Sequence, residues 1–239
     1  MHYAELPMPS GLNLLVAAVW TLDAGDDAGG WIEHVATPDG CIEVIARTRG
    51  RSAWRRDQPG LFVTGLSSKP IRFGFSGDAA FVAIKLWPWA WEVLGGFPCP
   101  AFADDWVGLA DDHALAPIVT GDVSGIPASL SALFAGREPP PIAQAILEAR
   151  SVAGIGANSG LGPRALQRWF AAHIGLPPRS YLKLLRFRES LRDLPGQTSL
   201  AGHAAEHGYA DQAHMARDFR AFAGGPPHEV RKRAHGPFL

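Results

Sequence analysis

Two stretches in the C-terminal half of the chain place side chains that can recognise bases at helical spacing. In LGPRALQRWFAAHIGLPPRSYL, residues 161–182, Arg164, Gln167 and Arg168 share one face of a helix because they lie three and four positions apart. The forked hydrogen-bonding groups of Arg and Gln match the edges of guanine and adenine in the major groove. The pattern favours a helix that reads DNA, with a merely solvated polar face as the alternative.

The same unit returns 49 residues later in the chain. LQRWFAAHIGLPPRSY corresponds to MARDFRAFAGGPPHEV, so that Arg168 matches Arg217. In the second copy the outward polar side chains are Gln212, His214 and Arg217. Two copies of one structural unit are the simplest account of this repetition.

Each copy has the pattern of a helix-turn-helix. A short helix ends at a glycine that can adopt the left-handed conformation, an apolar residue fills the turn, and Pro or Asp begins the second helix. In order, these are residues 152–158, Gly160, Leu161 and Pro163 in the first copy, and residues 200–207, Gly208, Tyr209 and Asp211 in the second. Residues 179–196 predict a helix that holds the two units apart, and successive major-groove faces repeat every ~34 Å.

Across residues 142–231 these landmarks resemble the DNA-binding domain of the AraC/XylS family of bacterial transcription regulators, which consists of two helix-turn-helix units joined by a long helix. The resemblance implies double-stranded DNA as a partner, and RNA polymerase as a further partner if the protein is an activator. It also implies that the following side chains face the groove: Arg164, Gln167, Arg168, Asp211, Gln212, His214 and Arg217.

Two features depart from the family pattern. The first helix of the first unit, in VAGIGANSG, contains Gly154 and Gly156, each of which costs ~1 kcal/mol relative to Ala inside a helix. This unit is therefore expected to be loose without DNA. His203 stands where an aliphatic residue is common, which favours a partly buried core histidine over a metal or pH-sensing role.

Charge divides the chain in the same place as the motifs. Residues 141–239 contain 13 Lys and Arg against 7 Asp and Glu, net +6, which leaves 9 against 16, net -7, for the remainder. Only the second half is therefore expected to meet a polyanion. Pro139, Pro140 and Pro141 predict a stiff linker, so we expect a β-rich sensor domain at residues 1–138 and a DNA-binding domain at residues 139–239.

The first half predicts an antiparallel β domain, either a barrel or a sandwich, and the chain as a whole is predicted to be α+β. The strand patterns are LNLLVAAVWTL, WIEHVA, CIEVIART, GLFVTGL, IRFGFS and AAFVAIKLW. Pro38-Asp39-Gly40 predicts a hairpin turn, residues 91–119 look mostly helical, and another helix is expected near residues 127–134. Over residues 12–115 this half resembles the β-barrel sensor domains that precede AraC-type modules, with TPDGCIEVI and the segment around LWPWAWEVLG as landmarks.

The sensor half holds seven of the eight tryptophans. Trp87, Trp89 and Trp91 are the candidates for a ligand pocket or an interface, because alternate residues share a face if this segment is extended. A plain core role is the alternative for any single tryptophan, since large aromatic side chains dominate protein cores.

No catalytic, metal or cofactor site is expected, because clustered His and carboxylate ligands, a phosphate-binding loop and a nucleophile elbow are all missing from the sequence. The favoured hypothesis is a DNA-binding regulator whose β domain binds a small-molecule effector or, as a homodimer, a second protomer. The alternative is a small-molecule-binding or scaffold protein whose helical half has lost DNA affinity. Without a membrane-spanning run or a signal peptide at the start of the sequence, a cytoplasmic location is expected.

Overall fold

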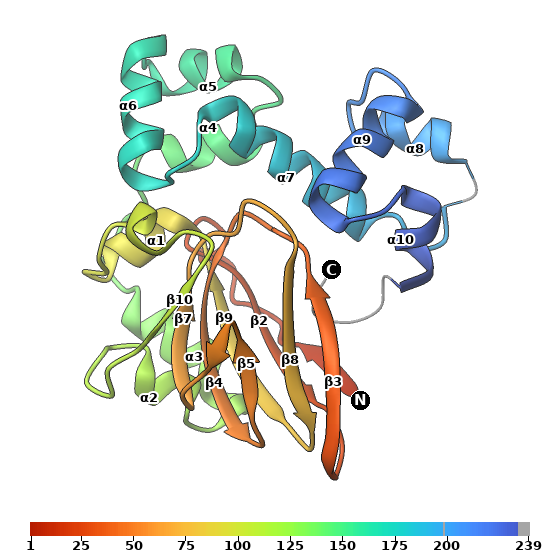
Figure 1. Cartoon of the computed structure of the whole chain (residues 1–239). Helices are drawn as coiled ribbons and strands as arrows, with labels where there is room; N and C mark the ends of the chain where they lie inside the picture. Colours follow the sequence, from red (N-terminus) through yellow and green to blue (C-terminus); the bar gives the residue numbers. More distant parts are fainter. Residues whose placement is uncertain (198, 234–239) are drawn as a thin grey trace.

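The chain forms a β domain followed by a helical domain, as the computed structural model of residues 1–197 and 199–233 shows (Figure 1). The α+β class predicted from the sequence is confirmed. Within these described ranges, no helix has both the length and the apolar character needed to cross a membrane.

Ten strands build the β domain as two antiparallel sheets packed in an open sandwich, so the barrel alternative is not adopted. One sheet has the order β1-β2-β9-β4-β7-β10 and the other has the order β3-β8-β5-β6. The strands are β1 His2–Glu5, β2 Val16–Asp23, β3 Asp27–Ala36, β4 Ile42–Arg49, β5 Ser52–Trp54, β6 Arg56–Asp57, β7 Leu61–Thr64, β8 Ile71–Gly77, β9 Ala80–Leu86 and β10 Trp106–Gly108.

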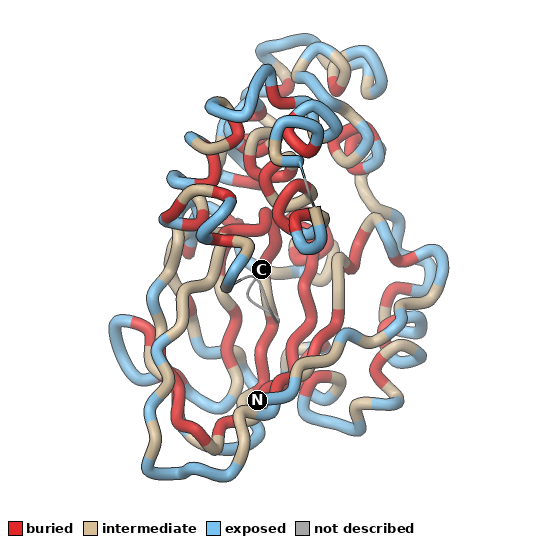
Figure 2. The backbone as a smooth tube through the Cα atoms, turned by 90° about the vertical axis from the view of Figure 1, so that its right-hand side faces the viewer, coloured by how far each residue is buried: buried red, intermediate tan, exposed pale blue. Residues whose placement is uncertain are grey.

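The six-stranded sheet is buried on both faces, which explains why its central strands read as continuous apolar runs. On β9, Phe81 and Ala83 belong to the core between the two sheets, whereas Val82 and Ile84 belong to the larger core on the other face. Helices α1 Pro88–Val93, α2 Ala116–Val119 and α3 Ile126–Leu133 lie on that other face (Figure 1). The buried strands run through the middle of the domain in Figure 2.

The hairpin predicted at Pro38-Asp39-Gly40 is wrong. Strand β3 pairs with β8, while β4 pairs with β7 and β9, so this turn passes from one sheet to the other. The Asp39 carboxylate accepts hydrogen bonds from Lys85 Nζ at 2.6 Å and from the Cys41 amide at 2.9 Å. Lys85 Nζ also lies 3.3 Å from Glu43 Oε1. This buried charge cluster holds the turn against the six-stranded sheet, and short-range turn signals do not reveal it.

The largely helical segment predicted at residues 91–119 is also wrong. Helix α1 ends beside Gly95, whose φ of +80° suits a glycine, and Pro98 and Pro100 prevent a regular helix from resuming. A short 3-10 helix, η1 Cys99–Phe102, strand β10 and helix α2 follow instead. The helix expected near residues 127–134 is confirmed as α3, after the 3-10 turn η2 Val123–Gly125.

The helical domain contains two helix pairs on either side of one long helix, with one further helix before the first pair and one after the second (Figure 1). The C-terminal unit resembles the first in its capping pattern, in agreement with the predicted repeat. The helices are α4 Ile142–Glu148, α5 Val152–Ser159, α6 Pro163–His173, α7 Pro178–Arg192, α8 Leu200–Glu206, α9 Gln212–Ala223 and α10 Pro227–Arg233.

We predict that Lys85→Met lowers the free energy of unfolding by about 3–5 kcal/mol, because it leaves the buried carboxylate of Asp39 and the partly buried one of Glu43 without their ammonium partner. Urea unfolding followed by tryptophan fluorescence measures this loss. As a control, the triple variant Asp39→Asn, Glu43→Gln and Lys85→Met removes all three charges together and is expected to recover part of the loss. Wild-type stability of the single variant would contradict the role given to this cluster.

Candidate nucleic-acid interface

The first helix pair, α5 and α6, is defined by local caps. The hydroxyl of Ser151 accepts a hydrogen bond from the Gly154 amide at 3.1 Å and so caps α5. Gly160 ends this helix with a φ of +70°, the left-handed conformation. A Cβ on Gly156 would lie 3.0 Å from the carbonyl oxygen of Leu161, so glycine at this position lets the turn pack closely on α5.

The second helix pair, α8 and α9, repeats these devices. Ser199 accepts from the Gly202 amide at 3.1 Å, and Gly208 has a φ of +69°. Tyr209 is buried in the turn, as a residue that fills the gap between the helices should be. The Asp211 carboxylate caps α9 by accepting from the His214 amide at 2.6 Å. The two pairs are therefore the same unit built twice.

Helix α6 presents a polar face to solvent. Arg164, Gln167 and Arg168 are all exposed, while Leu166 and Phe170 are buried on the opposite side. The first three of the proposed base-contacting side chains therefore lie together on one open helix face. Nothing in the described part of the domain covers them.

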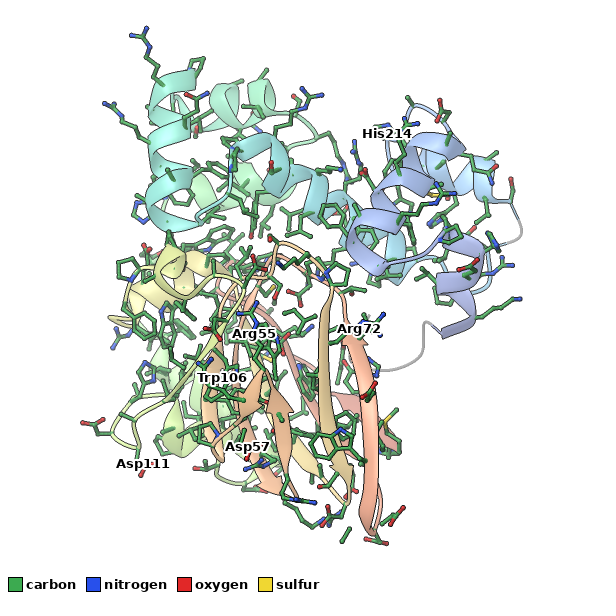
Figure 3. All side chains as sticks on the ribbon, viewed as in Figure 1. Arg55, Asp57, Arg72, Trp106, Asp111 and His214 are labelled. Atoms are coloured by element: carbon green, nitrogen blue, oxygen red, sulfur yellow. The ribbon has the colours of Figure 1, made fainter. Side chains whose placement is uncertain are left out.

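Helix α9 matches this face only in part. Arg217 stands where α6 has Arg168, but Ala213 and Ala216 stand where α6 has Arg164 and Gln167. Gln212 and Arg217 are exposed, and Asp211 is exposed although its carboxylate is already engaged as the helix cap. His214 is half-buried: its Nε2 lies 3.4 Å from Arg186 Nη2 and its ring packs edge-on against Tyr209 (Figure 3). In this conformation His214 is directed partly into the protein.

A buried carboxylate clamps α9 to the long helix α7. Asp218 on α9 is 1% exposed and lies 3.0 Å from Lys183 Nζ and 3.2 Å from Arg186 Nη2, both on α7. The guanidinium of Arg186 also stacks on Tyr209 at 4.5 Å, so the turn of the second unit is held by the same group. Sequence reasoning missed this clamp, because the spacing of 32 residues between Arg186 and Asp218 gives no local signal.

The expected core role of His203 is confirmed, since it is 1% exposed and its Nε2 lies 3.0 Å from Ser190 Oγ on α7. The two helices of the second unit are thus attached to α7 separately, α8 through His203 and α9 through Asp218. Helix α7 is the common support of the unit.

A cleft of about 810 Å³ separates the two units along α7. Its lining includes basic side chains that were not singled out from the sequence, namely Arg150, Arg179, Lys183 and Arg186, next to the proposed base-contacting Arg217. Part of this charge is compensated, because Arg150 Nη1 lies 2.5 Å from Glu189 Oε2. The sequence signal that could have pointed to these cleft residues was the high density of Lys and Arg in the second half of the chain.

The turn at residues 38–41 joins the β domain to α7. The buried hydroxyl of Tyr181 donates a hydrogen bond to the carbonyl oxygen of Gly40 at 2.8 Å. A Cβ on Gly40, whose φ is +81°, would lie 3.0 Å from Leu185 Cδ2, so the absence of a side chain lets α7 approach. Burial alone would raise the pKa of Asp39, but the charges of Lys85 and of Arg188 on α7 hold that pKa below its ordinary value.

Of Trp87, Trp89 and Trp91, the first two lie where the β domain meets the helical domain. The segment is not extended, because Pro88 begins helix α1 and the three side chains are buried in the core. Trp87 stacks on Trp89 and lies under the guanidinium of Arg188 at 4.8 Å, and Trp89 packs against Trp169 of α6 at 6.4 Å between ring centroids.

Trp91 lies deeper in the β domain, where its indole donates to the carbonyl oxygen of Phe97 at 2.9 Å. A polar contact completes the connection between α1 and α6, since His173 Nδ1 lies 2.5 Å from Glu92 Oε2. The β domain is therefore in contact both with the first polar helix, α6, and with the support helix, α7.

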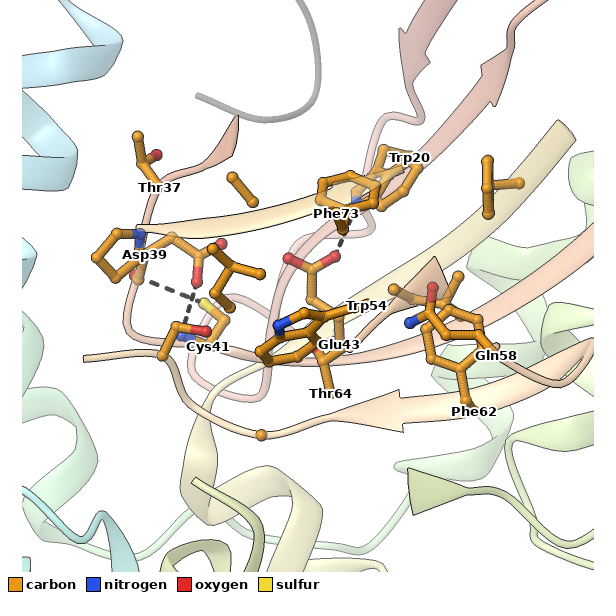
Figure 4. A pocket seen from close by; sticks show the side chains of 17 residues that line it. Trp20, Thr37, Asp39, Cys41, Glu43, Trp54, Gln58, Phe62, Thr64 and Phe73 are labelled. Atoms are coloured by element: carbon orange, nitrogen blue, oxygen red, sulfur yellow. Dashed lines mark hydrogen bonds between the residues drawn. The ribbon is translucent and has the colours of Figure 1, made fainter. Parts of the chain in front are cut away.

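A cavity of about 80 Å³ lies between the two sheets of the β domain (Figure 4). Its aromatic lining comes from Trp20, Trp54, Phe62, Phe73 and Phe81, and Trp87, Trp89 and Trp91 are not among the described residues around it. The sequence showed that this half is rich in tryptophan but not which of them surround a cavity.

The carboxylate of Glu43 projects into this cavity. Glu43 Oε2 accepts from the Trp20 indole at 3.2 Å. Burial is the main cause that raises the pKa of Glu43, and the negative charge of Asp39 adds to it, while the positive charge of Lys85 opposes both. Ionisation of Glu43 therefore costs free energy, and a further positive group in the cavity would reduce this cost.

Comparison with known families assigns both domains. Residues 155–233 match the family described as a helix-turn-helix domain, and residues 5–107 match a domain of unknown function, DUF6597. The chain carries an AraC-type helix-turn-helix DNA-binding domain at its C-terminal end, behind a DUF6597 domain. The resemblance found in the sequence is confirmed for the C-terminal DNA-binding domain.

Among solved structures, the chain is similar to an apo variant of ToxT from Vibrio cholerae, with 11% identity over 91% of this chain and 97% of that chain and a TM-score of 0.49. It is also similar to unsaturated fatty acid bound ToxT from Vibrio cholerae, with 10% identity over 91% of this chain and 94% of that chain and a TM-score of 0.48. The chain is also similar to the AraC-like transcriptional activator CuxR, with 15% identity over 95% of this chain and 83% of that chain and a TM-score of 0.20. These overall likenesses carry no functional argument, and no curated protein sequence matches the chain.

We predict that Asp218→Ala lowers the free energy of unfolding by about 1–3 kcal/mol, because Lys183 and Arg186 lose the carboxylate that they share. Hydrogen exchange is expected to increase in α9 before it increases in α6. Asp26→Ala is the matched control, because its carboxylate is fully exposed and its pair with Arg49 at 3.9 Å contributes little to stability. Equal effects of the two substitutions would refute the clamp.

Proposed function

We propose that this protein is a sequence-specific transcription regulator that reads two adjacent major-groove segments with α6 and α9 and changes its DNA affinity when an effector occupies the β domain. The observation that carries the proposal is the duplicated unit. Each copy exposes Arg and Gln side chains on one helix, at Arg164, Gln167 and Arg168 in the first and at Gln212 and Arg217 in the second. Asp211 and His214 belong to the same proposed surface.

Helix α7 suits this reading as a common support. Helix α6 contacts it near its start, where Phe170 packs on Tyr181, and α9 contacts it from Lys183 to Phe187. On B-DNA the two polar helices would enter major-groove faces that repeat every ~34 Å on one side of the duplex. A rigid support matters here because α6 and α9 must engage the groove together.

We place the boundary between sensor and DNA-binding domains after residue 138. The end of α3 at Leu133 and the start of α4 at Ile142 support this division. Trp87 and Trp89 then serve as an interface between the domains, whereas Trp91 packs within the β domain. A homodimer formed through the β domain would match paired sites in an operator, and RNA polymerase is the further partner if the regulator activates transcription.

The route from the β domain to the DNA-binding helices runs through two contacts. One joins α1 to α6 through Trp89 and Trp169, and the other joins the turn at Gly40 to α7 through Tyr181. An effector can change DNA affinity only if it binds two arrangements of these contacts unequally. The turn is suited to this role because Asp39, which forms part of the wall of the cavity, adjoins Gly40, which touches α7.

We predict that Arg168→Ala and Arg217→Ala each weaken specific DNA binding by about 1–3 kcal/mol and relax base preference in different segments of the site. Competition binding against a panel of single-base variants measures both effects. Arg51→Ala is the control, because Arg51 is an exposed arginine in the β domain that plays no part in the proposed interface. If both variants lose affinity equally for every sequence, these arginines contact phosphate only.

We predict that Gly40→Ala changes DNA affinity by about fivefold or more, although Gly40 lies outside the proposed DNA surface. The added methyl group meets Leu185 and Tyr181. In addition, the backbone at this position is left-handed, a conformation that is unfavourable for Ala. Circular dichroism checks the fold, and Tyr181→Phe tests the same contact by removing only its hydrogen bond.

Gly60→Ala is the control for this experiment, because a Cβ there meets its nearest neighbour at 3.7 Å, an ordinary contact. DNA binding by Gly40→Ala and Tyr181→Phe that equals the control would show that the turn does not communicate with the helical domain.

A further inference from the structure

The cavity between the sheets has an unusual combination of walls. Seventeen residues line it, and among these described residues are five aromatic side chains, the carboxylates of Asp39 and Glu43, and no Lys, Arg or His. Lys85 reaches both carboxylates but is not among the lining residues. The surface that a ligand meets is therefore aromatic and acidic.

Glu43 has capacity for another donor. Its side chain is 20% exposed, and each of its two oxygens has one protein donor nearby, Trp20 at 3.2 Å for Oε2 and Lys85 at 3.3 Å for Oε1. An ionised carboxylate can accept about four hydrogen bonds, so a donor entering the cavity finds a free acceptor position. In Figure 4 the carboxylate points between the rings of Trp20 and Trp54.

These features select one class of ligand. Aromatic faces attract a cation through their quadrupole, and a desolvated site strengthens the attraction. The same walls repel an anion, because its charge would face Asp39 and Glu43 without a cationic group at the surface. The cavity of about 80 Å³ is roughly half the size of a cavity of about 150 Å³ that binds benzene. It therefore fits a group of about four non-hydrogen atoms.

We propose that this cavity is the effector site and that it binds a small alkylammonium group, with the ammonium paired to Glu43 and the alkyl groups against the aromatic rings. The effector role rests on the regulator function proposed above, whereas binding of the cation itself does not require DNA. Occupation of the site changes the charge balance around Asp39, at the turn that contacts α7.

Proton release is a second consequence of the same geometry. Binding of a cation favours ionised Glu43, so affinity rises as pH increases through the raised pKa of this residue. The charged and titratable groups that face Glu43 are Asp39 and Cys41 from the turn, Lys85 from β9 and Tyr3 from β1. The thiol pKa of Cys41 and the phenol pKa of Tyr3 are raised, mainly by burial, so both stay neutral in the range tested.

The test is calorimetric titration of the full chain with three probes of four non-hydrogen atoms each: trimethylammonium, 2-propanol and acetate. We expect saturable binding of one trimethylammonium per chain, weaker binding of 2-propanol and none of acetate. Titrations between pH 5 and pH 8 in buffers of different ionisation enthalpy are expected to show tighter binding at higher pH, with proton release. Stronger binding of acetate, or no saturable binding of trimethylammonium, overturns the proposal.

Glu43→Gln is the matched variant, because it keeps the shape and an acceptor oxygen while it removes the charge. It is expected to weaken trimethylammonium binding at least about tenfold and to abolish the pH dependence. Asp111→Asn, an exposed carboxylate outside the cavity, is expected to bind like the wild type (Figure 3). Unchanged binding by Glu43→Gln overturns the proposal, and circular dichroism confirms that this variant is folded.

DNA binding is measured separately with and without trimethylammonium. A chain that binds DNA but no cation refutes the effector site alone, whereas one that binds the cation but no DNA refutes the regulator function alone. If both bind independently, the cavity is a cation site without an effector role, which also overturns the proposal.

Discussion

The requirement that one helix, α7, pack on the β domain and on α9 at once constrains the whole structure. On one face, Tyr181 donates to Gly40 and Leu185 packs over the same turn. On the opposite face, Lys183 and Arg186 hold Asp218 of α9. A displacement at one contact therefore disturbs the others, because packed helices shift as rigid bodies more readily than they deform. This constraint connects the cavity in the β domain to the spacing of the two polar helices.

The charge cluster beside this turn has a structural and a functional side. The pair formed by Asp39 and Lys85 is buried, so it contributes to a defined position of the turn more than to stability. Glu43 extends the cluster into the cavity, where its ionisation is costly without another cation. The same buried charges that direct the chain from one sheet to the other therefore also make the cavity acidic, which is why a ligand could alter the turn.

The parts of the structure that depend on local signals were predicted from the sequence. Glycines with positive φ at Gly160 and Gly208 and a capping Asp211 define each helical unit within a few residues, so the duplicated fold and its exposed polar face follow from the pattern. The β domain depends on pairing between distant strands. There the hairpin at residues 38–40 was wrong, because the partner that fixes Asp39 is Lys85, 46 residues away.

The same reason limits prediction of the sites. Exposed side chains on one helix face can be deduced from spacing, whereas the Asp218 clamp and the cavity around Glu43 exist only once distant segments meet. The tryptophans illustrate both cases. Their abundance in the first half was visible in the sequence, but the start of α1 at Pro88 gave Trp89 to the domain interface and left Trp20 and Trp54 to the cavity.

The central claim is that one chain reads two adjacent groove segments with a separation set by α7. Selection from a random duplex library on the purified protein, with and without trimethylammonium, tests it most directly, followed by insertion of about 5 base pairs, half a helical turn, between the selected segments. The account predicts two short segments centred about 10 base pairs apart and a steep loss of affinity after the insertion, which moves one segment to the opposite side of the duplex. A single short segment, or affinity that is indifferent to the insertion, would contradict it.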